Sequence, residues 1–173
     1  MTEAGSDTVR QSHGAAMRRR AAARLAAVQA LYQIEMTGVA VERAIAEFLD
    51  GDRPQPDGED EDLAALPAPD PDLFTSVVRG VVSKRAQLDE LIAGALSADW
   101  TVARLEILVR LILEAGIYEI TFRGDIPVKA SINEYLNVSN AFFNGAEPGL
   151  INAVLDAVAK ATGPAAPPKE QAR

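Results

Sequence analysis

Hydrophobic residues recur at three- and four-residue steps along most of this chain, which is the spacing of amphipathic helices. The first run begins near Arg19 and stops at Gly38, a residue type that commonly ends helices. Its apolar positions are Leu25, Val28, Tyr32 and Met36. A second, shorter run covers residues 41–49. No segment alternates with a period of two for long, so the pattern predicts helices and no sheet.

Four further helices are predicted beyond a segment at 51–71 that is rich in proline, glycine and acid: 71–93, 102–122, 128–143 and 148–161. Asp70 and Pro71 supply an N-cap residue and a first-turn proline for the first of these. The helix at 102–122 is apolar around most of its circumference, so we expect it to be the central buried element. Helices joined mostly by short turns predict an all-α bundle.

The domain organisation follows from where this pattern begins and ends. The chain has 173 residues, enough for one domain with its own core. Residues 1–17 are polar and are expected to form a disordered tail. Residues 18–162 form the helical domain, with the segment at 51–71 as an acidic solvated loop, and residues 163–173 form a flexible tail.

The composition excludes several kinds of chemistry. There is no cysteine, and the only histidine is His13 in the polar N-terminal stretch. Thiol catalysis, cysteine metal sites and histidine-dependent triads therefore lack their residues. We expect no cofactor and no bound metal. No apolar run reaches the length of a membrane span and the N-terminus lacks the apolar core of a secretory signal, so a cytoplasmic protein is expected.

Acidic residues do not make a convincing catalytic or metal site either. Glu106, Glu114 and Glu119 occur along the central helix, but the first and last are nearly four turns apart and no histidine accompanies them. The acidic run from Asp57 to Asp62 lacks the glycine and the ligand spacing of a calcium loop. The sequence therefore predicts a protein without catalysis.

The net charge of −8 is unevenly distributed along the chain. Residues 51–72 hold eight acidic residues against Arg53, whereas residues 1–24 hold five arginines against Glu3 and Asp7. Arginines at the start of a helix are mildly unfavourable for the helix dipole, so their placement there favours the binding of an anion. A chain polarised in this way can bind phosphate groups despite its acidic total.

Three stretches of the sequence, taken together, resemble the NusB family of transcription antitermination proteins. The first is Arg18-Arg19-Arg20 followed by Ala27-Val28-Gln29-Ala30-Leu31-Tyr32. The second is Arg110-Leu111-Ile112-Leu113, then Tyr118-Glu119 and Arg123-Gly124-Asp125-Ile126-Pro127. The third is Ile132-Asn133-Glu134, followed by Leu150-Ile151-Asn152-Ala153-Val154-Leu155. The family usually has Phe-Val-Asn-Gly where this chain has Leu150-Ile151-Asn152-Ala153, so an aromatic ring that could stack on a base is replaced here.

The resemblance implies an all-α fold of six to seven helices in two packed subdomains. It implies binding of boxA-like nascent RNA together with NusE, a ribosomal protein of the small subunit, within the RNA polymerase antitermination complex. No membrane is involved. The implied RNA contacts are Arg18, Arg19, Arg20, Arg24, Gln29, Tyr32, Arg123 and Lys129. The implied partner contacts are Tyr32, Glu106, Arg110, Glu147 and Leu150.

Purely structural interpretations of these residues stay open at this point. Tyr32 lies on the apolar stripe, so it is equally a core ring with an exposed hydroxyl group. Arg110, Arg123 and Lys129 are equally ordinary surface charges. The polar residues within apolar helices are interpreted as interhelical hydrogen bonders: Asn133, Glu134 and Asn152.

Two other functions also fit the pattern. One is a protein–protein adaptor that does not bind RNA, which the acidic loop and Leu150 would favour. The other is a detached RNA-binding domain related to that of RNA cytosine methyltransferases. Such an enzyme needs a glycine-rich cofactor loop and a nucleophilic cysteine, and this sequence has neither. RNA binding measured with and without NusE distinguishes the adaptor from the antitermination factor.

Overall fold

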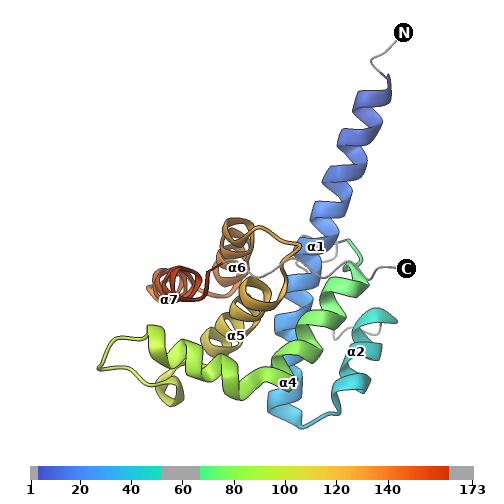
Figure 1. Cartoon of the computed structure of the whole chain (residues 1–173). Coiled ribbons are helices and arrows are strands. Elements are labelled where there is room, and N and C mark those ends of the chain that lie inside the picture. The colour runs from blue at the N-terminus through green and yellow to red at the C-terminus, as the bar shows by residue number, and fades with distance from the viewer. Residues whose placement is uncertain (1–3, 52–66, 164–173) are drawn as a thin grey trace, which may run out of the picture. The chain divides into compact units, whose positions relative to one another are not determined.

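The computed structural model describes residues 4–51 and 67–163, and the backbone there is helical without a strand, which confirms the all-α prediction (Figure 1). The contacts divide the chain into two compact units, Met1–Ser76 and Val77–Arg173. The helices are α1 (Ala4–Thr37), α2 (Val41–Leu49), α4 (Pro71–Ala95), η1 (Val102–Arg104), α5 (Ile107–Phe122), α6 (Val128–Phe142) and α7 (Glu147–Thr162). Among them, none is long and apolar enough to cross a membrane.

The first unit is built on a small-residue face of α1. Five alanines of that helix are buried, together with Val28 and Leu31: Ala22, Ala23, Ala26, Ala27 and Ala30. Alanine side chains allow a close approach of α2, which contacts α1. The rings of Phe48 on α2 and Phe74 at the start of α4 stack at 5.7 Å between centroids. The first unit therefore combines a thin alanine seam with one aromatic pair, and both contributions depend on close packing.

The predicted cap of α4 is confirmed. The carboxylate Oδ1 of Asp70 accepts a hydrogen bond of 2.9 Å from the backbone N–H of Leu73, and Pro71 is the first residue of the helix. The N–H of Asp70 donates a bond of 3.0 Å to the carbonyl oxygen of Arg19 in α1. Asp70 thus satisfies a free donor of α4 and also fastens the start of that helix to α1. The rest of the predicted acidic loop, residues 52–66, lies outside the described residues, as does the predicted tail from 164.

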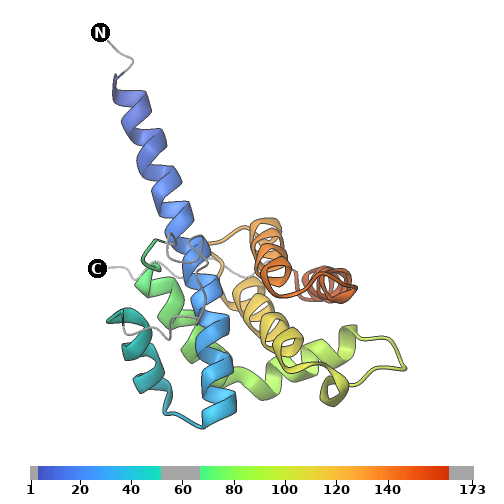
Figure 2. The ribbon, with the colours of Figure 1, turned by 180° about the vertical axis from the view of Figure 1, so that it is seen from behind.

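The start of α1 differs from the prediction of a disordered tail over residues 1–17, because residues 4–17 are helical, whereas residues 1–3 lie outside the described residues. The helix begins at Ala4 rather than near Arg19, and its first turns extend past α2 (Figure 2). Residues 10–19 are exposed except for the half-buried Gly14, so no apolar stripe marks them as helical in the sequence. Elongating an existing helix adds one hydrogen bond for each residue fixed and avoids the cost of nucleation. The predicted end is confirmed, since α1 stops at Thr37 and Gly38 has a φ of +69°.

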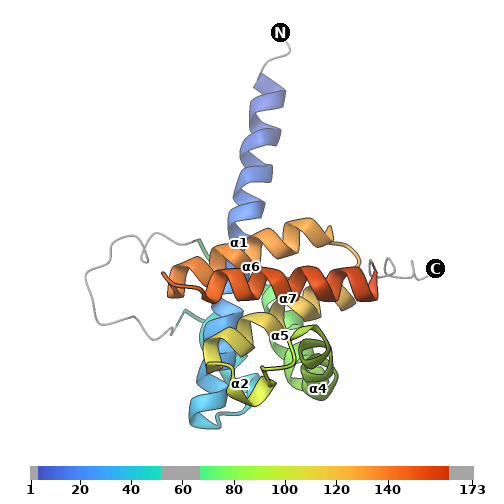
Figure 3. The same ribbon diagram turned by 90° about the vertical axis from the view of Figure 1, so that its left-hand side faces the viewer.

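The second unit is organised around α5, as the sequence predicted. Residues 111–120 are all buried, and α5 contacts both α6 and α7, which also contact each other (Figure 3). The helix is shorter than the predicted 102–122. Leu105 and Glu106 have extended backbone angles, which separate the turn of η1 from α5. The apolar pattern continued across this break because Leu105 is itself half-buried.

Two glycines permit the close packing of α5 with its neighbours. A Cβ atom on Gly116 of α5 would lie 2.9 Å from the Cδ2 atom of Leu155 on α7. A Cβ atom on Gly80 of α4 would overlap the ring of Tyr118, with its nearest atoms at 2.1 Å. Neither position has room for a larger side chain without movement of the neighbouring helix or ring.

Two carboxylates are buried on α5, and each has a different environment. Glu119 is completely buried and accepts hydrogen bonds from two residues of α6. The hydroxyl of Ser131 donates to Oε1 at 2.7 Å, and the hydroxyl of Tyr135 donates to Oε2 at 3.1 Å. Both oxygens of Glu119 therefore have a donor, which offsets much of the cost of removing the group from water.

Glu114 is completely buried between two arginines. Its oxygens lie 2.9 Å from the Nε atom of Arg110 and 3.3 Å from the Nε atom of Arg85 on α4, although neither pair is aligned as a hydrogen bond. Arg110 also forms two hydrogen bonds with the carboxylate of Asp89, at 2.8 and 3.3 Å. Burial raises the pKa of Glu114 to about 7, against the opposing effect of the two guanidinium groups.

Substituting alanine at two glycines of α4 tests the packing against Tyr118. Gly80→Ala should lower the free energy of unfolding by about 1–3 kcal/mol, because the new methyl group forces the tyrosine ring to move. The same substitution at Gly94 should raise it by roughly 0.4–1 kcal/mol, because nothing lies within 4 Å and alanine restricts the unfolded chain. Urea unfolding of both variants measures these values, and equal effects at the two sites would contradict the packing.

Glu114→Gln tests the buried carboxyl. Between the ordinary pKa of 4.5 and the folded value of about 7, the folded chain holds one more proton than the unfolded chain. The free energy of unfolding should therefore fall as the pH rises through this window, by up to about 1.4 kcal/mol per pH unit. Glutamine does not titrate, so the variant should lack this contribution. Chemical unfolding at pH 5, 6 and 7 measures the difference. Glu90→Gln, an exposed carboxylate on α4, is the matched control, and parallel profiles for the wild type and Glu114→Gln would refute the assignment.

Candidate nucleic-acid interface

The first candidate residues lie along one face of α1. Arg18, Gln29 and Tyr32 follow one another at intervals of eleven and three residues, which places them on the same side of a helix. All three are exposed, and Met36, one turn further on, is exposed as well. Half-buried Leu25 lies between the arginine and the glutamine. This group, Arg18, Leu25, Gln29, Tyr32 and Met36, is called the α1 face below.

The electrostatic character of α1 is uniform over a long stretch. Between Asp7 and Glu35 the chain has five arginines and no carboxylate, in a protein whose net charge is −8. Arg18 and Arg19 are exposed and Arg20 is half-buried. A run of cations with no acidic residue among them in the sequence has the charge that phosphate groups require.

Arg24 corrects the predicted set of RNA contacts. Only 4% of its surface is exposed, so it offers almost nothing for RNA to contact. The reason is its position on the helix, since Arg24, Val28 and Leu31 are separated by four and three residues and share the core-facing side. The helical period of the sequence already indicates that Arg24 lies on the core-facing side. The prediction missed this because it grouped Arg24 with the neighbouring arginines.

The structure places part of Tyr32 at the surface. Tyr32 is 37% exposed and Met36 is 59% exposed, so the ring is not enclosed in the core and part of it is accessible to a partner. The predicted apolar stripe of Leu25, Val28, Tyr32 and Met36 is in fact divided, because only Val28 is fully buried. An exposed tyrosine and methionine one turn apart form a small apolar patch of the kind found in protein interfaces. Met36 is a candidate that the sequence interpretation missed by assigning it to the core.

The two RNA contacts predicted in the second unit, Arg123 and Lys129, differ in how available their charges are. Arg123 forms two hydrogen bonds with the carboxylate of Asp125, at 2.9 and 3.0 Å, and this contact raises the pKa of the guanidinium. Its charge is thereby partly neutralised. Lys129, in the first turn of α6, is exposed. Of these two predicted RNA contacts, Lys129 is the more available cation.

Arg110 has a structural role that its sequence context did not reveal. Its guanidinium binds Asp89 and lies beside buried Glu114, so it belongs to the packing of α4 against α5. The other predicted partner contacts lie at helix starts. Glu106 is exposed and immediately precedes α5, whereas Glu147 and Leu150 are half-buried in the first turn of α7.

Two polar residues differ from their structural interpretation. Asn133 on α6 and Asn152 on α7 are exposed, so the prediction that they form hydrogen bonds between helices inside the core is wrong. The buried polar contacts between α5 and α6 are made by Glu119, Ser131 and Tyr135 instead.

Within the described ranges, no three acidic or histidine side chains are placed to hold a metal ion together.

Comparison with known proteins places this arrangement in a family. Residues 21–160 match the model of the NusB family. The chain is 44% identical over 160 residues to the transcription antitermination protein NusB of Rhodospirillum rubrum, covering 86% of both chains. It is also similar to the solved structure of T. maritima NusB, with a TM-score of 0.67, 26% identity and coverage of 85% of this chain and 93% of that one.

A second solved structure shares the fold. It is a complex of the antitermination factors NusB and NusE with double-stranded RNA, with a TM-score of 0.66 and 20% identity, covering 84% of this chain and 98% of that one. The match to the family model spans most of the chain and includes Gln29, Tyr32 and all of the second-unit candidates. The chain therefore belongs to the NusB family.

Proposed function

We propose that this protein is a transcription antitermination factor that binds boxA-like nascent RNA together with NusE. The observation that carries this proposal is the basic stretch of α1, where Arg10, Arg18 and Arg19 are exposed and Arg20 is half-buried, and where the sequence has no carboxylate between Asp7 and Glu35. Its relatives are transcription antitermination proteins, and one structural neighbour was solved with NusE and RNA. These similarities support the same pair of ligands for this chain.

The chemistry of α1 suits RNA in two ways. Arginine guanidinium groups bind phosphate oxygens through paired N–H donors, and each phosphate that is neutralised releases counterions. Gln29 and Tyr32 add an amide and an aromatic ring on the α1 face, which can bind base edges and stack on a base. Lys129 in the second unit supplies a further exposed cation.

The apolar end of the α1 face suits a protein partner. Tyr32 and Met36 are exposed, and Gln29 adjoins them one turn away on the same face towards the arginines. NusE bound at this patch would lie next to RNA bound at the arginines. Such a pair of proteins forms one continuous site for RNA, so each ligand strengthens the binding of the other.

The protein acts without chemistry of its own in this proposal. As a member of the NusB family it is a non-catalytic factor, and its role is to join RNA and NusE for the RNA polymerase antitermination complex. Nascent RNA is present where transcription takes place, so this function belongs with the cytoplasmic location expected from the sequence.

Replacing Arg18, Arg19 and Arg20 with alanine tests the RNA contact. On single-stranded RNA, the slope of log affinity against log salt should become shallower by about 0.7 for each phosphate that the variant no longer neutralises, roughly 2 in all. Thermal unfolding should change little, because Arg18 and Arg19 are exposed. Fluorescence anisotropy with a boxA-like RNA and NusE at several salt concentrations measures the slope.

The matched control for the triple variant is Arg43→Ala on α2, whose side chain is 74% exposed and paired with Glu47. This variant should keep the wild-type slope. An unchanged slope in the triple variant would remove the basis of the proposed function.

Tyr32→Asp tests the partner surface. The aspartate is solvated in the free chain, because the tyrosine it replaces is exposed, so helical content should not change. In the complex the charge would be buried without a partner, which should weaken NusE binding by about 2 kcal/mol or more, roughly thirtyfold. Leu49→Asp on α2 is the control, since Leu49 is 39% exposed and lies off the α1 face. Isothermal titration with NusE compares them, and equal losses for both variants would place the interface elsewhere.

A further inference from the structure

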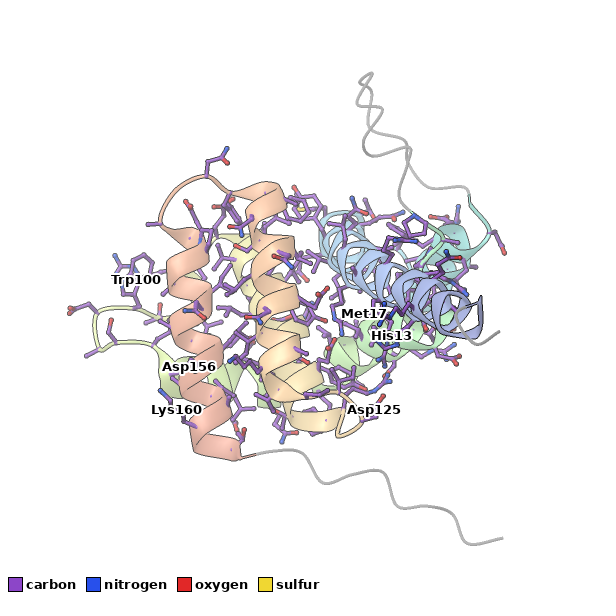
Figure 4. The ribbon with its side chains drawn as sticks, turned by 90° about the horizontal axis from the view of Figure 1, so that it is seen from above. His13, Met17, Trp100, Asp125, Asp156 and Lys160 are labelled. Atoms are coloured by element: carbon purple, nitrogen blue, oxygen red, sulfur yellow. The ribbon has the colours of Figure 1, made fainter. Side chains whose placement is uncertain are left out.

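The N-terminal turns of α1 carry exposed residues that the proposed site does not include. Arg10, His13 and Met17 are all exposed and follow one another at three and four residues, so they share one side of the helix. Figure 4 shows His13 and Met17 on this helix. They precede residue 21, where the match to the family model begins. This segment, residues 10–17, is called the α1 extension below.

The side chains of the α1 extension are of the types that bind single-stranded RNA. A guanidinium group binds a phosphate, and an imidazole ring stacks on a base. The thioether of Met17 is 55% exposed and adds a flexible apolar surface one turn from the ring. No carboxylate lies between Arg10 and Arg18, and the nearest one in the sequence is Asp7, three residues before Arg10.

The helical backbone gives these side chains fixed positions. Arg10 and Arg18 are eight residues apart on one continuous helix, which separates their Cα atoms by about 12 Å. The extension therefore lies beyond the arginine run along the helix axis. RNA that binds Arg18, Arg19 and Arg20 would need additional nucleotides to reach Arg10.

We propose that the α1 extension is a second RNA-contact segment, in which Arg10 binds a phosphate and His13 stacks on a base of the RNA that flanks the boxA-like element. This inference rests on the proposed function, because it requires RNA at the adjacent arginine run. Helical continuity is part of the proposal. A segment held as a helix loses less conformational freedom on binding than a disordered tail.

The test uses the full chain with NusE and two fluorescent RNAs, the boxA-like element alone and the same element with flanking nucleotides at both ends. The double variant Arg10→Ala, His13→Ala should bind the longer RNA roughly tenfold more weakly or worse, as expected for the combined loss of an exposed charge pair and a base stack. Its salt slope with that RNA should fall by about 0.7. Binding of the short RNA should equal that of the wild type.

Two substitutions at Gly14 test the helix without changing charge. Gly14→Pro removes the helical hydrogen bond to Arg10 and clashes with its carbonyl group, so it should weaken binding of the longer RNA as the double variant does. Gly14→Ala should preserve or strengthen that binding, because nothing lies within 4 Å of the new Cβ atom and alanine favours the helix. Circular dichroism measures the helix content of both variants.

The outcomes separate this inference from the function on which it rests. If the double variant binds the longer RNA normally while the variant of Arg18, Arg19 and Arg20 binds weakly, the extension is not a contact and the proposed function stands. If both bind normally, the proposed function fails. If the double variant binds weakly but Gly14→Pro does not, Arg10 acts without helical positioning and the proposed helical arm is wrong.

Discussion

The second unit depends on a helix that has no exposed side over ten consecutive residues, 111–120 of α5. Such a helix must place its polar side chains beside partners inside the protein, because burial removes them from bulk solvent. Glu119 accepts hydrogen bonds from two hydroxyl groups of α6, whereas Glu114 lies 2.9 and 3.3 Å from two arginines, one of them on α4, as ion pairs without an aligned hydrogen bond. The polar contacts of α5 therefore determine which faces of α4 and α6 can pack against it, and the apolar residues fill the space between.

The helices themselves were largely predictable from the sequence, because the 3.6-residue period and the cap residues are local signals. Asp70 and Gly38 act at helix ends as predicted. The first turns of α1 were not predictable in this way. Residues 10–19 bury no apolar face, so periodicity could not distinguish this segment from a disordered one, and its helix is an elongation of a packed one.

The residue types of the candidate site were predictable from the sequence, but which of these residues are exposed was less predictable. Arg18 and Tyr32 are exposed as an interface requires, whereas Arg24 is buried. Arg110 was predicted as a partner contact, yet it is held by Asp89 and lies beside Glu114. The sequence shows where the charged residues are, but it does not show which of them form ion pairs. Those pairs depend on contacts between residues that are far apart in the chain.

The proposed function depends on α1 being the element that RNA touches first and most extensively. Ultraviolet crosslinking of a boxA-like RNA to the wild-type chain in the presence of NusE, followed by mass spectrometry of the peptides, tests this directly. We expect crosslinks in peptides of α1 that contain Arg18, Arg19, Gln29 or Tyr32. Crosslinks confined to peptides of α6 and α7, with none in α1, would contradict this role of α1.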